Sequence, residues 1–281
     1  MNKENEVRLV EDVEKLIIEG LKKGYRQNLF FTQNYTGFQS RIIEYLITVN
    51  IAQSLEEYCF KGCLGVNLEY PLEKFYNGSF PCIKYNYPDI PPNTNKEGKK
   101  LLNYFGATLQ NRKDHNPSQN KSKRLDIAIT GDPIHTDGYL TNERRSLVGI
   151  EIKTLNPSKA SVIKDITRLA DALNLEDEIS ENQILCGFVC FFRRFDKENE
   201  TFSQHQINNS KKSEKNKWIK NLNDLTEIYP KLNFNIIPEV LEESPVENVG
   251  PFEEKPELEN YEDYADNSGL VIGYLIKITH K

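Results

Sequence analysis

Three charged residues interrupt two strongly apolar segments of the chain. Asp126 lies near the start of residues 124–129 (RLDIAI), and Glu151 and Lys153 lie within residues 147–154 (LVGIEIKT). Both segments are short and rich in β-branched residues, which is typical of buried strands. Because side chains of a strand alternate between its two faces, Glu151 and Lys153 share one face and the neighbouring isoleucines take the other. Charged residues are seldom buried without a partner or a metal, so these three residues indicate a functional site.

The chemistry that these residue types support is metal-dependent hydrolysis. Two carboxylates on rigid strands are suited to Mg²⁺ or Mn²⁺, which take oxygen ligands and also bind phosphate oxygens. Such an ion polarises a phosphoryl group or activates a water, and Lys153 beside it orients that water or stabilises charge that develops on the phosphate. The structural alternative is an exposed Glu151–Lys153 pair on an edge strand, with Asp126 paired to Arg124 or capping a turn.

The order of these residues resembles the D…(D/E)xK core of the PD-(D/E)XK nuclease superfamily. Asp126 supplies the first acid, and Glu151-Ile152-Lys153 supplies the ExK element. The residue before Asp126 is Leu125, where the family pattern has proline. The resemblance covers roughly residues 36–194 as an order of motifs. It implies an α/β fold with a mixed central β-sheet flanked by helices, a restriction-endonuclease-like core, and a Mg²⁺- or Mn²⁺-dependent endonuclease activity.

The resemblance also implies roles for individual residues. The implied catalytic residues are Asp126, Glu151, Lys153 and Glu44, and the implied metal ligands are Asp126, Glu151, Ile152 and Glu44. Glu44 matches an acidic ligand on the family's core helix, but a solvent-facing glutamate is an equal interpretation. Glu69 is a further outer ligand or a surface residue. Basic residues beside the two strands are candidates to contact nucleic-acid phosphates, with solvated charge as the alternative; they are Lys121, Lys123, Arg124, Lys159, Lys164 and Arg168.

Charge is distributed unevenly along the chain. The 281 residues carry a net charge of −6, which is unexpected for a protein that binds nucleic acid. Residues 239–266 hold eleven acids and one base, so this segment carries −10 and the rest of the chain carries +4. Phosphate binding requires local rather than total positive charge. Four of the chain's prolines also lie between 238 and 256, which indicates an irregular acidic insertion.

Composition indicates a cytoplasmic protein that does not enter a membrane. No apolar run approaches the ~20 residues that span a bilayer, and the first residues lack the apolar core of a secretory signal. The five cysteines are odd in number and form no CxxC pair, so we expect most of them to be buried thiols in a reducing compartment.

We expect one nuclease-like domain over residues 1–281. It comprises an N-terminal helical extension (1–35), a core (36–194) and a C-terminal elaboration (195–281) that contains the acidic insertion 239–266. The hydrophobic patterns predict the following elements: helices at 4–23 (ended by Gly24), 36–60 (with a Thr36–Gln39 capping box), 158–174 and 218–229; strands at 64–72, 184–193, 231–238 and 270–278; and a hairpin over 131–146 that joins the two active strands.

The leading interpretation is a metal-dependent nuclease, acting on DNA by family resemblance, in a restriction or antiphage defence system. One alternative is a nuclease subunit that a regulatory protein partner activates, and another is a non-catalytic nucleic-acid-binding protein on the same fold. A homodimer is also an option, because cutting two strands requires two sites. Composition does not separate DNA from RNA.

Overall fold

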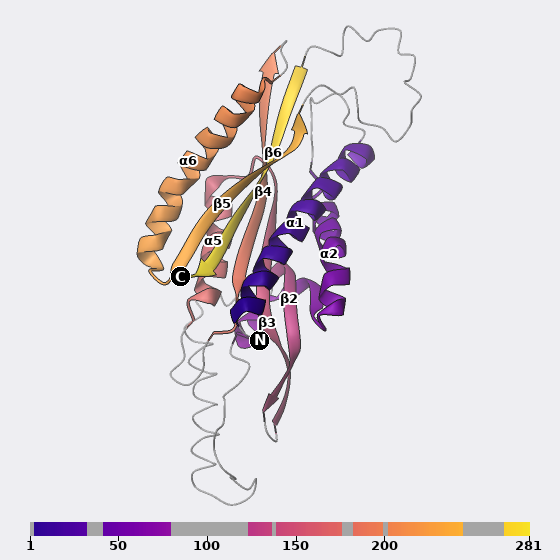
Figure 1. Ribbon diagram of the computed structural model, residues 1–281, viewed down its shortest axis with the longest axis vertical. Coiled ribbons are helices and arrows are strands. Elements are labelled where there is room, and N and C mark those ends of the chain that lie inside the picture. Colours follow the sequence, from indigo (N-terminus) through magenta and orange to yellow (C-terminus); the bar gives the residue numbers. More distant parts are fainter. Residues whose placement is uncertain are drawn as a thin grey trace, which may run out of the picture.

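The computed structural model describes residues 3–32, 42–79, 123–136, 139–175, 182–198, 202–243 and 267–281. These residues form an α/β structure in which a mixed six-stranded sheet lies between helices (Figure 1). The predicted class, a mixed sheet flanked by helices, is confirmed. The elements are, in order, α1 (Lys3–Thr32), α2 (Glu44–Lys61), β1 (Gly65–Pro71), α3 (Leu72–Asn77), β2 (Arg124–Thr136), β3 (Tyr139–Leu155), α5 (Lys159–Leu173), β4 (Cys186–Glu198), α6 (Gln204–Ile228), β5 (Leu232–Glu243) and β6 (Asn267–His280).

The strands follow the order β1-β2-β3-β4-β6-β5 across the sheet. Strands β1, β2 and β3 are antiparallel neighbours, and β3 and β4 run parallel to each other. A parallel pair requires a crossover connection, which α5 provides. Strand β6 lies between β4 and β5 and is antiparallel to both, so the two C-terminal strands extend the same sheet.

Each face of the sheet has its own apolar core. Helices α1 and α2 cover one face, where Ile17 and Ile51 pack with Ile150 of β3. Helices α5 and α6 cover the other face, where Leu169 and Trp218 pack with strand residues of the opposite pleat. Strand β4 contributes buried side chains to both cores, as its uninterrupted apolar sequence predicts.

Both N-terminal helices differ from their predicted limits. Helix α1 continues through Gly24 to Thr32, so the prediction that Gly24 ends it is wrong. Gly24 instead lies where α1 crosses α2, and a Cβ there would be 3.1 Å from the Cα of Ile47. Helix α2 begins at Glu44, after non-helical residues 42–43, and ends at Lys61, one residue beyond the predicted end, with Gly62 as its C-cap. The predicted Thr36–Gln39 capping box lies outside the described residues.

The C-terminal half also shows longer elements than predicted. Helix α6 begins at Gln204, where Ser203 and Gln206 form a capping box. Strand β5 extends to Glu243, so residues 239–243 belong to the sheet and the predicted start of the acidic insertion at 239 is wrong. Glu239 forms a 2.7 Å ion pair with Lys22 of α1. The rest of the predicted insertion, residues 244–266, lies outside the described part of the chain.

The predicted hairpin and the helix after it are confirmed. Thr136 pairs with Tyr139 at the end of the β2–β3 hairpin. Helix α5 begins after Ser158, whose side chain accepts a hydrogen bond from the Ser161 N–H. Of the described cysteines, Cys63 is exposed and the other three are buried free thiols, as expected for small apolar residues.

Candidate active site

The first feature of the site is a place where β2 and β3 separate. The regular pairing of the two strands reaches Ile127 opposite Ile150 and stops there. The next N–H of β3, that of Ile152, donates a 2.6 Å hydrogen bond to Oδ2 of Asp126. A carboxylate of β2 therefore takes the place of the backbone acceptor, and it is held between the ends of the two strands.

The second feature is an irregularity in β3 between Ile152 and Leu155, the interval that contains Lys153. Ile152 lies opposite Cys190 of β4, but Leu155 lies opposite Phe192, so β3 contains one extra residue in this interval. Bulges of this kind redirect side chains and are common beside active sites. Lys153 nevertheless contacts α5, as does Glu151, and so both charged side chains lie on the face that the alternation predicts.

A chain of ion pairs connects β3 to α5 on this face. The Lys153 ammonium lies 2.9 Å from Oδ2 of Asp165, and Oδ1 of Asp165 lies 2.9 Å from the Arg168 guanidinium. The other terminal nitrogen of Arg168 bonds to Oε1 of Glu151. The side chains of Glu151 and Asp165 are only 2% and 3% exposed. Two buried acids are thus each compensated by a cation, which is the condition under which buried charge is tolerated.

The carboxylates of the site influence one another. Burial raises the pKa of Asp126, and the charges of Asp165 and Glu69 raise it further, against the Ile152 hydrogen bond and Lys153. Burial also raises the pKa of Glu151 well above its ordinary value, although Arg168 opposes this. The acids of the cluster, Asp126, Glu151 and Asp165, outnumber Lys153 and Arg168, so formal negative charge is in excess here.

Glu44 belongs to the same charged cluster. It is the first residue of α2 and is half-buried. Burial is the main cause of its raised pKa; Lys153 opposes the rise, and the charges of Asp126 and Asp165 add to it. The structure therefore brings Glu44 close to β2 and β3, rather than leaving it on a remote solvent-facing surface.

Backbone conformations around the site are unusual. Glu69 of β1 has φ of 51°, between two residues that pair regularly with β2, and its side chain is exposed. Asn156, which follows β3, has φ of 50°, and its side chain accepts a hydrogen bond from the Arg194 N–H. Non-glycine residues at positive φ are uncommon and tend to occur at functional sites. Two such residues border the strands that carry Asp126 and Lys153.

The predicted phosphate-contacting residues occupy different environments. Arg124, Lys159 and Lys164 are exposed, and Lys123 is half-buried. Arg124 begins β2 and Lys159 begins α5, so both lie at the end of the sheet where β3 stops. Arg168 is the exception, because its side chain is only 13% exposed and bonds to Glu151 and Asp165. Lys121 lies outside the described residues.

Sequence reasoning did not include Asp165 in the site. A signal for it was present, because Asp165 is three residues after Val162 and four before Leu169, both buried in the α5 stripe. This spacing places an acidic residue on the buried side of an amphipathic helix. Its partners could not be read locally, because they depend on how α5 lies across β3.

The acidic residues offer oxygen ligands for a divalent cation. Mg²⁺ and Mn²⁺ favour carboxylate and carbonyl oxygens, which Glu44, Asp126, Glu151 and the Ile152 peptide supply. The excess negative charge fits such an ion, which would relieve the repulsion among these carboxylates. In the conformation that the structure describes, however, no group of three or more His, Cys, Asp or Glu side chains forms a metal-binding arrangement within the described residues. Glu151 and Asp126 are instead held by Arg168 and by the Ile152 N–H.

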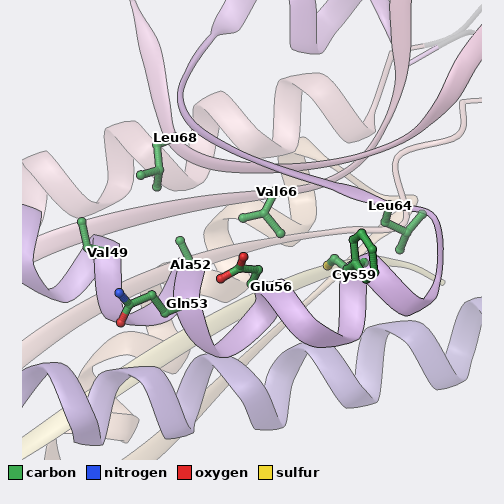
Figure 2. A pocket seen from close by; sticks show the side chains of 9 residues that line it. Val49, Ala52, Gln53, Glu56, Cys59, Leu64, Val66 and Leu68 are labelled. Carbon is green, nitrogen blue, oxygen red and sulfur yellow. The ribbon is translucent and has the colours of Figure 1, made fainter.

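A separate cavity of about 310 Å³ lies between α2 and β1 (Figure 2). Its lining is mainly apolar, and it contains none of the residues of the charged cluster.

Comparisons of the chain with family models, with curated proteins and with solved structures found no match. None of the helices in the described part of the chain is both long and apolar enough to cross a membrane.

Proposed function

We propose that this protein is a metal-dependent nuclease that hydrolyses phosphodiester bonds in nucleic acid. One observation carries the proposal: Asp126 of β2 and Glu151 and Lys153 of β3 occupy one charged cluster at the point where these two strands separate. Apart from α3, which is inserted between β1 and β2, the succession of α2, β1, β2, β3, α5 and β4 follows the motif order of the PD-(D/E)XK resemblance, which supports the proposal of a restriction-endonuclease-like core.

The carboxylates of Glu44, Asp126 and Glu151, with the Ile152 carbonyl, would hold Mg²⁺ or Mn²⁺. When bound, the ion supplies a Lewis acid for the phosphoryl oxygen and lowers the pKa of a water ligand. Strands β2 and β3 carry Asp126 and Glu151, helix α2 carries Glu44, and the Ile152 N–H sets the orientation of Asp126. Sites built on strands hold such geometry more closely than sites on loops.

Lys153 acts in this proposal as a cation and not as a base. Burial, the largest single cause, lowers its pKa, but the hydrogen bond and charge of Asp165 together with the charges of Glu151 and Glu44 outweigh burial and raise the pKa above its ordinary value. An ammonium donates hydrogen bonds and accepts none. Lys153 would therefore stabilise negative charge that develops on the phosphate, and it would not remove a proton from the attacking water.

DNA is the proposed substrate on family resemblance, and a restriction or antiphage defence role is the proposed setting. The exposed cations Arg124, Lys159 and Lys164 would contact the phosphate backbone, which carries no sequence information by itself. A regulatory partner or a second copy of the chain is proposed only as an additional requirement for activity.

The experiment is a cleavage assay with circular duplex DNA, single-stranded DNA and RNA in Mg²⁺, Mn²⁺ or EDTA. The wild type is compared with Lys153→Met and with Lys277→Met. Lys277 is a matched control, because both lysine side chains are 22% exposed and each is paired with one acid. We expect metal-dependent cleavage that Lys153→Met lowers by about 10²–10³-fold and Lys277→Met leaves unchanged.

Each contrary outcome has a distinct meaning. Cleavage that persists in EDTA would contradict the metal requirement. Equal losses in both lysine variants would show a general effect on the fold. Absence of cleavage with every substrate, together with metal-independent DNA binding, would favour the non-catalytic alternative.

A further inference from the structure

Two residues of α5, Asp165 and Arg168, are bound into the site without a role in the proposed hydrolysis. The Arg168 side chain is 13% exposed and bonds to carboxylates that are themselves almost completely buried. A buried cation is costly unless it is paired and hydrogen-bonded, so the two acids are required to hold Arg168 in place. The planar guanidinium can bond to both at once because its donors form a fixed fork.

Arg168 occupies one oxygen of a proposed metal ligand. Its guanidinium bonds to Oε1 of Glu151, and Glu151 is 2% exposed, so no solvent replaces this interaction. A divalent cation bound to the Glu151 carboxylate would compete with the guanidinium for the same negative charge. A change of partner at Glu151 would thus accompany metal binding.

Asp165 provides an alternative partner for Arg168 during such a change. Asp165 and Arg168 are one turn apart on α5, so their 2.9 Å ion pair does not depend on Glu151. The second oxygen of Asp165 holds Lys153 at 2.9 Å. Asp165 therefore retains both cations beside the site whichever partner Glu151 has.

We infer that Arg168 is the counter-ion that a divalent cation displaces from Glu151, and that Asp165 retains Arg168 and Lys153 at the site after the displacement. This inference rests on the proposed function, because it takes Glu151 as a metal ligand. Both residues are positioning residues, since they act through Glu151 and Lys153.

The test is calorimetric titration of the full chain with Mn²⁺, without nucleic acid. Arg168→Gln removes the competitor and should tighten Mn²⁺ binding by about tenfold or more, within the range over which residues behind metal ligands act. Asp165→Asn leaves Glu151 as the only anionic partner of Arg168 among the described residues and should weaken Mn²⁺ binding. Opposite changes in the two variants would not arise from a common loss of structure.

Arg168→Lys separates displacement from a general effect of charge. Lysine keeps the positive charge but lacks the planar fork that bonds to two carboxylates. Displacement predicts tighter Mn²⁺ binding than in the wild type, by less than in Arg168→Gln. Equal affinity in Arg168→Lys and the wild type, with tighter binding in Arg168→Gln, would overturn the inference in favour of long-range charge. This variant also serves if Arg168→Gln does not fold.

Arg193→Gln is the matched control. Arg193 forms a 3.0 Å ion pair with the buried Glu214 between β4 and α6. Its removal should leave Mn²⁺ affinity unchanged. Wild-type binding that Arg168→Gln does not tighten would overturn the inference but leave the metal site standing. Absence of Mn²⁺ binding in the wild type and in every variant would instead contradict the proposed function.

Discussion

The contact between α1 and α2 makes a sharp prediction about the helix that carries Glu44. In Gly20→Ala, the new Cβ would lie 2.5 Å from the Cα and 3.0 Å from the backbone N of Ile51. Because these are backbone atoms, rotation of a side chain cannot relieve the contact, and α2 must move away from α1. Overpacking of this kind lowers the free energy of unfolding by about 1–3 kcal/mol.

Two terms decide the net effect of Gly20→Ala. Because the 2.5 Å contact is with backbone, the cost should lie in the upper part of the overpacking range, about 2–3 kcal/mol. Alanine favours a helix over glycine by about 1 kcal/mol, so the net loss should be about 1–2 kcal/mol. Gly24→Ala is the internal comparison, because its Cβ would meet the flexible Cδ1 of Ile47 at 3.0 Å and the backbone Cα of Ile47 only at 3.1 Å, against 2.5 Å for the backbone contact at Gly20. In that variant the helix propensity gained should largely offset the crowding.

The assay is urea unfolding of the wild type and both alanine variants, followed by circular dichroism. We expect Gly20→Ala to unfold at clearly lower urea and Gly24→Ala to unfold close to the wild type. A Gly20→Ala variant as stable as the wild type would refute the close helix crossing. So would a larger loss in Gly24→Ala than in Gly20→Ala.

Three further predictions concern other parts of the molecule. Burial raises the pKa of Glu151 in the folded chain, so ionisation of this carboxyl favours the unfolded chain. Its contribution to the free energy of unfolding is therefore fully present at pH values below 4.5, the pKa of the unfolded chain, and is lost as the pH rises toward the higher pKa of the folded chain. Glu151→Gln should therefore show a smaller fall in unfolding free energy between acid and neutral pH, and an unchanged fall would contradict this. Among the described cysteines, a thiol reagent should modify the exposed Cys63 well before the buried Cys59, because burial raises the pKa of the Cys59 thiol to about 11. Mass spectrometry of the labelled peptides measures the order, and faster labelling of Cys59 would contradict this prediction. Ser203→Ala should cost about 1 kcal/mol in urea unfolding by removing the α6 cap, whereas the same change at exposed Ser213 in the middle of α6 should cost nothing.

Elements with a strong local pattern could be predicted from the sequence. The apolar run of β4, the stripe of α5 with Ser158 before it, and the hairpin between β2 and β3 all follow from periodicity and turn chemistry. These signals lie within a few residues of one another, so no tertiary information is needed to read them.

The ends of the helices could not be predicted so well, because one residue type can have different structural roles. A glycine after an apolar stripe looks like a helix end, but Gly24 instead permits α1 to approach Ile47 of α2. Which of these applies depends on a helix that lies elsewhere in the sequence. The first turns of α6 were likewise not predicted, because the residues before Trp218 are mostly polar and give no apolar stripe. An exposed helix face requires no apolar residues.

Only those site residues that a local pattern marks could be predicted from the sequence. Charged residues within apolar strands single out Asp126, Glu151 and Lys153, and the structure brings these three together with Glu44. The ion pairs that link Glu151 and Lys153 to α5 depend on the crossover that places this helix over β3. No local pattern reports those contacts, and so Asp165 remained outside the predicted site.

The most direct test of the proposed nuclease site is a comparison of Asp126→Asn with Asp171→Asn in Mn²⁺-dependent cleavage of DNA. The two aspartates are closely matched: burial raises the pKa of both, and each accepts a 2.6 Å hydrogen bond, Asp126 from the Ile152 N–H and Asp171 from the Tyr229 hydroxyl. We predict that Asp126→Asn abolishes cleavage while Asp171→Asn cuts as the wild type does. Cleavage by Asp126→Asn at the wild-type rate would contradict the assignment of the active site.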